Sequence, residues 1–288
     1  MKIIDLLTEN KLTISFEVFP PKTETNFESV KQATEDIATL KPAFMSVTYG
    51  AGGGTSKYTL DIAKDIKHNF GVPSLAHLTC VSSSKETVHQ RIEDILSAGI
   101  TNIMALRGDI PKELQNTDRS KWDYNYAIDL IKEIKARGDF CIGGACYPEK
   151  HPESKNKEDD ILHLKEKVDA GCDFLTTQMF FDNALYYNFL DDAKKAGINV
   201  PIMPGIMPIT NKVQIERAIS LSGSYIPQKF VDEIENADTD SVMDIGIEYA
   251  IEQIIDLFKN GVKNVHVYSM NKPEVARRIL VNLKGIID

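Results

Sequence analysis

Short runs of apolar and β-branched residues recur along the chain at intervals of about thirty residues. Each run is six to eight residues long and is bounded by polar or turn-forming residues, which is typical of a strand in a buried parallel sheet. The runs lie at 12–19, 44–49, 73–80, 102–109, 140–147, 174–181, 201–207 and 264–270. The pattern therefore predicts eight strands.

Longer stretches with helical periodicity separate these runs. In residues 26–40, 85–98 and 158–170, apolar positions recur every three or four residues, which places them on one face of a helix. An Ala-Gly pair follows at 98–99, 170–171 and 196–197. Glycine just beyond the last turn is a common helix-ending residue, so we expect helices to end at these pairs.

Strand–helix alternation of this kind predicts βαβ units and a parallel sheet. Eight units predict a (β/α)8 TIM barrel, for which about 250 residues is the typical size. The interval 208–263 is longer than the others and predicts extra helices near the C-terminus, around 226–237 and from about 240, with a terminal helix from about 274. The alternative is an open, doubly wound sheet. The stretch GAGGGT at 50–55 departs from the G-x-G-x-x-G fingerprint of that class, so we favour the barrel.

Composition sets limits on the function. The 288 residues have 42% hydrophobic content and a formal net charge of −9, which argues against nucleic acid as the partner. No apolar run is long enough to span a membrane, and the N-terminus lacks a signal-peptide pattern. The four cysteines show neither zinc spacing nor a disulfide rhythm, and the histidines form no metal-binding pair. We expect a cytoplasmic protein without a metal site.

Polar residues gather at the ends of the predicted strands, where barrel enzymes place their chemistry. Glu17 lies near the end of the first run, His77 in the third, and Arg107 and Asp109 close the fourth. A structural interpretation stays open for each: Glu17 as half of an ion pair at the rim, and His77 as a hydrogen-bonded core residue. Polar residues at many strand ends together indicate a site at the mouth of the barrel.

Several motifs resemble those of the methylenetetrahydrofolate reductase family, in its bacterial single-domain form. They are SFEVFPPK (15–22), SVTYGAGG (46–53), ALRGD (105–109), ACYPEKHPE (145–153), KVDAGCDFLTTQMFFD (167–182), PGIMPIT (204–210) and HVYSMNK (266–272). The resemblance covers nearly the whole chain and implies one catalytic barrel domain over residues 1–288. It implies an oxidoreductase with non-covalent FAD, in which NADH or NADPH reduces the flavin. The flavin then reduces methylenetetrahydrofolate to methyltetrahydrofolate in a ping-pong cycle, which supplies methyl groups for methionine synthesis.

The resemblance also assigns residues to roles, position by position. The family's catalytic acid matches Glu17, and Asp109 is expected beside the flavin, where it opposes negative charge on the reduced ring. The folate contacts match Glu17, Gln178, Tyr268 and Lys272, the last of which is commonly arginine in the family. The flavin contacts match Thr48, His77, Arg107, Gly108, Asp109, Ala127, Tyr147, His151, Asp160, His163 and Lys167.

Residue chemistry agrees with these roles. Arg107 and Lys167 suit a pyrophosphate, and Gln178 offers a donor and an acceptor to a pterin edge. A general acid needs a pKa near the working pH, and we expect burial among Phe16, Val18 and Phe19 to raise that of Glu17.

Other functions stay open at this point. They are a flavin-independent reductase of the same substrate, a cofactor-free lyase or aldolase, and a non-catalytic barrel that serves as a partner subunit. The aldolase would need a Schiff-base lysine, and none of the eight runs contains a lysine. The resemblance further suggests a homo-oligomer, and the choice between NADH and NADPH is left open.

Overall fold

The computed structural model describes residues 1–21, 24–49, 56–115 and 117–287. The glycine-rich stretch 50–55 lies outside these ranges. Strands and helices alternate along the described chain. The strands are β1 (Thr13–Val18), β2 (Met45–Val47), β3 (Ser74–Thr79), β4 (Asn102–Leu106), β5 (Cys141–Cys146), β6 (Phe174–Thr177), β7 (Ile202–Met203), β8 (Gly205–Ile206) and β9 (Asn264–Tyr268).

The α-helices fill the intervals between the strands and follow the last one. They are α1 (Ile3–Thr8), α2 (Phe27–Thr39), α3 (Ser56–His68), α4 (Lys85–Ser97), α5 (Ala127–Arg137), α6 (Lys157–Asp169), α7 (Asn183–Lys195), α8 (Val213–Ser222), α9 (Gln228–Asn236), α10 (Val242–Lys259) and α11 (Pro273–Ile287). Short 3-10 turns are η1 (Glu24–Asn26), η3 (Lys112–Leu114) and η4 (Arg119–Lys121).

The parallel sheet closes on itself. Its order in the described residues is β7-β6-β5-β4-β3-β2-β1-β9-β8, and only Pro204 separates β7 from β8. The two ends of the order are therefore one segment, the predicted strand 201–207. Its first half pairs with β6 and its second half with β9. Proline has no N–H for a strand ladder, which explains the break. The closed sheet confirms the predicted (β/α)8 barrel and excludes the open, doubly wound alternative.

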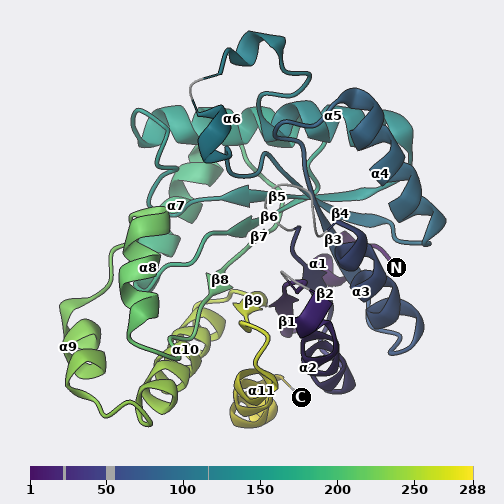
Figure 1. Ribbon diagram of the computed structural model, residues 1–288. Coiled ribbons are helices and arrows are strands. Elements are labelled where there is room, and N and C mark those ends of the chain that lie inside the picture. Colours follow the sequence, from purple (N-terminus) through teal and green to yellow (C-terminus); the bar gives the residue numbers. More distant parts are fainter. Residues whose placement is uncertain (22–23, 50–55, 116, 288) are drawn as a thin grey trace.

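Helices surround the strands on the outside of the barrel (Figure 1). The outward-facing residues of the strands pack against them: Phe16, Val18 and Val267 are fully buried in this layer. The extra helices predicted around 226–237 and from about 240 are α9 and α10, and a further helix, α8, also lies in the interval 208–263. In Figure 1, α8 and α9 stand at the side of the barrel, away from its axis.

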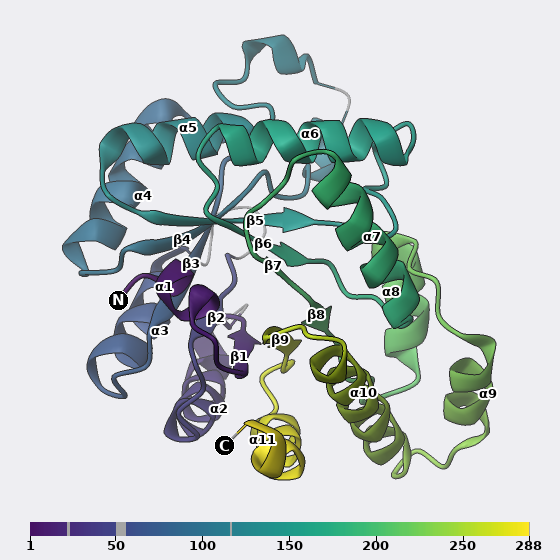
Figure 2. The ribbon, with the colours of Figure 1, turned by 180° about the vertical axis from the view of Figure 1, so that it is seen from behind.

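The first helix, which the sequence pattern did not reveal, lies at the N-terminal end of the barrel (Figure 2). Ile3 and Leu7 of α1 are buried against Phe44, Met104 and Phe174, which point into the barrel interior. This apolar cluster covers much of the N-terminal end of the barrel interior. The polar side chains at the C-terminal ends of the strands lie at the opposite end, which is the mouth.

The expected helix ends are confirmed. Gly99, Gly171 and Gly197 follow α4, α6 and α7 with φ angles of 69°, 115° and 77°. A positive φ suits glycine, and each glycine redirects the chain toward the next strand. None of the described helices is long and apolar enough to cross a lipid bilayer.

Candidate active site

Glu17 lies on the inner face of β1, near the mouth of the barrel. Its Oε2 accepts a hydrogen bond of 3.1 Å from Ser46 Oγ on β2. His77 Nε2 on β3 lies 3.5 Å from the same oxygen, and His266 Nε2 on β9 lies 3.8 Å from it. The side chain of Glu17 retains 19% exposure. Side chains from β2, β3 and β9 therefore surround one carboxylate oxygen of Glu17.

The surroundings of Glu17 hold its pKa below the ordinary value. Burial acts strongly in the other direction and raises the pKa, but the contact with His266, the electrostatic influence of His77 and His266 and the hydrogen bond from Ser46 together outweigh it. The expectation that the apolar neighbours raise this pKa is therefore wrong for the chain without ligands. Burial also lowers the pKa of His77, although Glu17 opposes this shift.

His266 and Ser46 belong to this cluster but were not among the predicted site residues. His266 is 2% exposed, and its ring stacks on Phe44 with centroids 5.6 Å apart. It lies two residues before the predicted Tyr268, so strand alternation puts both on the inner face. That spacing was the signal available in the sequence.

A second group of predicted residues surrounds Arg107, just beyond β4. Both terminal nitrogens of Arg107 donate to the carboxylate of Glu153, at 2.6 and 2.7 Å. This forked pair raises the pKa of Arg107 and lowers that of Glu153. Glu153 belongs to the ACYPEKHPE motif but had no predicted role. In the structure it holds the arginine that we expected to face a pyrophosphate.

Tyr147 and His151 follow β5 beside this pair. Their rings meet edge to face with centroids 4.7 Å apart. The backbone N–H of His151 donates to Asp160 on α6 at 3.1 Å. Burial raises the pKa of Tyr147 to about 12, and the charge of Asp109 adds to this shift.

Lys167 on α6 completes the group. Its Nζ donates to the carbonyl oxygen of Ala145 at 2.6 Å. Burial lowers the pKa of the ammonium, with opposing contributions from groups that include Asp160. A buried cation held by a backbone carbonyl is suited to an incoming anion.

The remaining predicted flavin contacts lie around these groups. Thr48 follows β2, and its N–H donates to Val18 O at 3.0 Å. Gly108 follows Arg107, Asp109 is exposed beyond it, and Ala127 is the first residue of α5. Thr48, Gly108 and Asp109 thus lie just beyond strand ends, as expected for the mouth of the barrel, whereas Ala127 begins a helix. The flavin contacts of all four stay predictions.

His163 differs from the other predicted residues. It lies one turn before Lys167 on α6, but its side chain is 60% exposed and its Nδ1 lies 3.1 Å from Glu166. Asp159 lies 3.8 Å from its other ring nitrogen. Its hydrogen-bonding contact is thus with its own helix, and its role toward the flavin stays a prediction.

The predicted folate contacts lie on the other side of Glu17. Tyr268, at the end of β9, donates through Oη to Thr177 O at 2.5 Å. Gly205 makes this contact possible, because a Cβ there would lie 2.5 Å from Tyr268 Oη. Gln178 follows β6, and its N–H donates to Cys146 O at 2.7 Å.

Lys272, after β9, is half-buried, and its Nζ donates to Thr210 Oγ1 at 2.7 Å. Burial lowers its pKa. The pKa of Tyr268 is raised by burial and then by the charges of Glu17 and Tyr147, so the three groups of residues interact electrostatically around one mouth.

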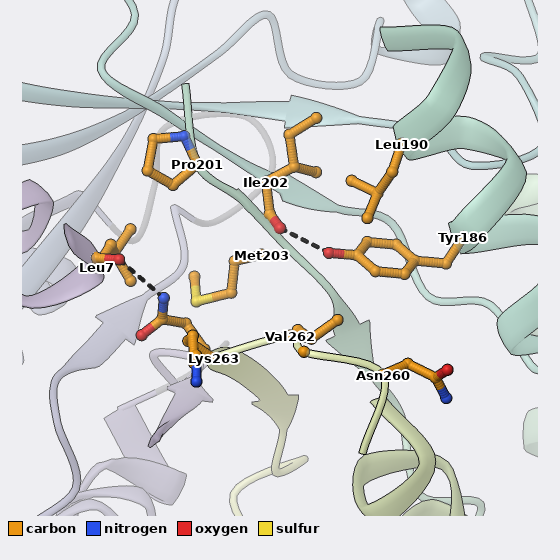
Figure 3. A pocket seen from close by; sticks show the side chains of 11 residues that line it. Leu7, Tyr186, Leu190, Pro201, Ile202, Met203, Asn260, Val262 and Lys263 are labelled. Carbon is orange, nitrogen blue, oxygen red and sulfur yellow. Dashed lines mark hydrogen bonds between the residues drawn. The ribbon is translucent and has the colours of Figure 1, made fainter. Parts of the chain in front are cut away.

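A cavity of about 310 Å³ lies at the opposite end of the barrel (Figure 3). It forms where β7 and the start of β9 are not paired, and Leu7, Ile202 and Met203 line it. Tyr186 Oη donates to Ile202 O at 2.7 Å, and Asn264 Nδ2 donates to Leu7 O at 3.0 Å. These polar groups are satisfied within the chain, and none of the predicted site residues lines the cavity.

The fold and the mouth define a (β/α)8 barrel of the enzyme type, with a carboxylate, two histidines and two cationic groups at the C-terminal ends of its strands. The family model of methylenetetrahydrofolate reductase matches residues 2–284. The chain belongs to this family.

Relatives agree with this assignment. The chain is 36% identical to the 5,10-methylenetetrahydrofolate reductases of Pectobacterium carotovorum and Escherichia coli, over 94% of this chain and 90% of theirs. It is 37% identical to methylenetetrahydrofolate reductase 1 of Schizosaccharomyces pombe, over 100% of this chain and 49% of that protein. It thus spans about half the length of that relative.

Solved structures share the fold. An uncharacterised protein from Clostridium thermocellum that binds two copies of 5-methyl-5,6,7,8-tetrahydrofolic acid superposes with a TM-score of 0.73, at 17% identity and over 98% of both chains. An oxaloacetate acetylhydrolase superposes with a TM-score of 0.53 at 14% identity, over 99% of this chain and 86% of that one. At these identities the likeness concerns the barrel alone.

Proposed function

We propose that the protein reduces methylenetetrahydrofolate to methyltetrahydrofolate, with bound FAD and with NADH or NADPH as the hydride donor, in a ping-pong cycle. The observation that carries the proposal is the position of Glu17. It is a carboxylate at the mouth of a family-typical barrel, within 4 Å of two histidines and flanked by the predicted flavin and folate residues. Family membership supports the substrate, and the residues at the mouth support the cofactor.

The residues fit a flavin on one side of the mouth. His77 Nε2 is buried and has no hydrogen-bond partner within the part of the chain that the structure describes. Arg107 and Lys167 place two cations around His151, which suits the pyrophosphate of FAD. When bound, FAD supplies hydride transfer between the two substrates. The chain would hold it through these groups together with Tyr147 and Asp160.

The other side of the mouth fits a folate. The Gln178 amide can donate and accept at a pterin edge, because its side-chain carbonyl and amino group offer both. Lys272 places a cation near Thr210, and a folate carries carboxylates at its far end. A lysine binds a carboxylate as a point charge, whereas the family's usual arginine would bind it as a fork.

Glu17 would hold and deliver the proton that opens the folate ring. Because its pKa lies below the ordinary value, the carboxyl is ionised in the chain without ligands at neutral pH. We therefore infer that Glu17 takes up its proton after a substrate covers the mouth. Loss of the remaining water would disfavour the charged carboxylate and raise the pKa.

The test separates the two halves of the reaction. Glu17→Gln is expected to accept hydride from the nicotinamide cofactor at the wild-type rate and to reduce the folate about 10²–10⁴-fold more slowly, since that is the usual contribution of a general acid. Glu28→Gln, an exposed glutamate on α2, serves as the matched control. Full folate turnover by Glu17→Gln would show that Glu17 is structural.

We further propose a cytoplasmic homo-oligomer whose product supplies methyl groups for methionine synthesis. Two plant relatives, from Arabidopsis thaliana and Zea mays, carry NADH in their names. Parallel assays with NADH and NADPH decide the donor for this chain, and sedimentation of the purified protein decides its oligomeric state.

A further inference from the structure

We propose that Asn271, in the turn after β9, is a positioning residue that directs Glu17 into the mouth by fixing the backbone where β1 ends. The inference rests on the proposed role of Glu17 as the proton donor to the folate. It deepens that role, because it identifies the contact that holds the exit of β1 beyond its last pair with β9.

The side chain of Asn271 binds both backbone groups of Phe19, two residues after Glu17. Phe19 N–H donates to Asn271 Oδ1 at 2.9 Å, and Asn271 Nδ2 donates to Phe19 O at 2.8 Å. A primary amide offers one acceptor and one donor side by side, as the backbone of a strand does. The side chain therefore continues the pairing of β1 with β9 beyond Glu17 and Tyr268, the last pair in the register.

The backbone beyond Phe19 cannot supply such pairing. Pro20 and Pro21 follow directly, both are buried, and proline has no N–H to donate. Phe19 is therefore the last residue before the prolines whose N–H can hold the exit of the strand. A second contact adds to the first, because Ser269 Oγ donates to Glu17 O at 2.6 Å. The turn after β9 thus binds the chain at Glu17 itself and again two residues further on.

The turn that carries Asn271 has an uncommon backbone conformation. Lys272 N–H donates to Ser269 O at 3.0 Å, which closes the turn. The two residues between them, Met270 and Asn271, have φ angles of 54° and 53°. Positive φ at both central residues is typical of turns built from glycine or asparagine, and methionine adopts it rarely. Such conformations persist where surrounding contacts hold them, and the two bonds to Phe19 are contacts of this kind.

Asn271 also precedes Lys272, the proposed folate cation, so the two effects have to be separated. Both of these amide hydrogen bonds go to Phe19, on the β1 side. Lys272 Nζ is held independently, by Thr210 Oγ1 at 2.7 Å. Loss of the Asn271 side chain is therefore expected to displace Glu17 and to leave Lys272 in place. In kinetic terms, the rate constant of the folate half-reaction falls and the folate KM stays the same.

The first test is Asn271→Gly, which keeps the left-handed backbone accessible and removes both bonds. This variant is expected to accept hydride from the nicotinamide cofactor at the wild-type rate. Its folate half-reaction at saturating folate is expected to be about 10–100-fold slower, since a displacement of about 1 Å costs up to about 10²-fold. A rise in the folate KM alone would assign Asn271 to Lys272, and equal slowing of both half-reactions would assign it to the fold. Either result would overturn the proposal.

Lys41→Gly is the matched control. Lys41 also has a positive φ, 54°, and its Nζ donates to the carbonyl oxygen of Phe70, but it follows α2 at the opposite end of the barrel. This variant is expected to keep both half-reactions at the wild-type rates. If it slowed the folate half-reaction as much as Asn271→Gly does, the effect would not depend on Phe19 and the proposal would fail.

A double substitution shows whether Asn271 acts through Glu17. In a Glu17→Gln background, Asn271→Gly is expected to slow the folate half-reaction by less than about twofold more, because the group that Asn271 positions is gone. If the two effects multiply, Asn271 acts independently of Glu17 and the proposal is wrong.

Hydrogen exchange at the Phe19 amide adds a readout that needs neither cofactor nor turnover. Asn271→Gly is expected to speed this exchange about tenfold, as for loss of one hydrogen bond, and to leave exchange in β5 unchanged. Unchanged exchange at Phe19 would overturn the proposal. A protein that binds no FAD would contradict the proposed function but leave the exchange result standing, so the two failures are distinguishable.

Discussion

Gly246, in the second turn of α10, allows the helix to pass directly over the chain segment that follows β8. A Cβ at this position would lie 1.7 Å from Ile209 O and 2.7 Å from Ile209 C, whereas real Cβ atoms essentially never come within 3.0 Å of another atom. Ile209 precedes Thr210, the partner of Lys272. Gly246→Ala therefore perturbs both the packing of α10 and the proposed folate side of the mouth.

The size of the effect follows from two opposing contributions. Overpacking against a backbone carbonyl costs about 3 kcal/mol, the upper end of the usual range, because no side chain can rotate away. Alanine favours the helical conformation over glycine by about 1 kcal/mol, which offsets part of this cost. We expect the free energy of unfolding of Gly246→Ala to fall by about 2 kcal/mol.

Gly285→Ala in α11 is the matched control, because a Cβ there meets nothing within 4 Å. It is expected to stabilise by about 0.5–1 kcal/mol. The two variants should differ in melting temperature by roughly 5–10 °C, measured by calorimetry at one scan rate. The folate KM should rise for Gly246→Ala alone. Equal melting temperatures for the two variants would refute the packing of α10 on Ile209.

Three further predictions concern the mouth of the barrel. Glu153→Gln removes the ion pair that holds the Arg107 guanidinium. Partly exposed ion pairs are worth up to about 1 kcal/mol, so FAD should bind up to about fivefold tighter in a fluorescence titration. Weaker binding would mean that Glu153 orients Arg107 for the cofactor. Lys272→Met loses the ammonium and its bond to Thr210, so the folate KM should rise about tenfold while reduction by the nicotinamide cofactor stays unchanged. Lys272→Arg is the conservative control. An equal loss in both half-reactions would argue against a folate contact. Burial lowers the pKa of His77 below 6.5, so the unfolded chain binds more protons and wild-type stability should fall as pH drops below 6.5. In His77→Gln the urea midpoint should change less between pH 7.5 and 5, and an unchanged slope would assign this pH dependence to other groups.

The barrel could be predicted because its strands are buried on both faces. Such strands appear as short apolar runs, and the Ala-Gly pairs marked where the helices between them end. The break at Pro204 could not be seen in the same way, because its neighbours Ile202, Met203 and Ile206 continue the apolar pattern. Helix α1 is six residues long, and so short a segment carries little periodicity.

The positions of Glu17 and His77 in the predicted strands indicated that both lie at the mouth. In the structure, His77 Nε2 lies 3.5 Å from Glu17 Oε2. The predicted shift in the pKa of Glu17 had the wrong direction. The prediction used the flanking residues in the sequence, which are apolar, whereas the neighbours of Glu17 in space include His266 and Ser46. These two come from β9 and β2, and contacts between distant strands are set by the register of the sheet. The Arg107–Glu153 pair joins the loops after β4 and β5. It could not be predicted, because these loops meet only in the folded barrel.

The most direct test of the central claim is an anaerobic titration of the purified protein supplied with FAD. The account predicts a yellow protein whose visible flavin absorption is bleached by NADH or NADPH and restored by one equivalent of methylenetetrahydrofolate, with methyltetrahydrofolate as the product. A protein that binds no FAD, or a bleached flavin that methylenetetrahydrofolate leaves reduced, would contradict it.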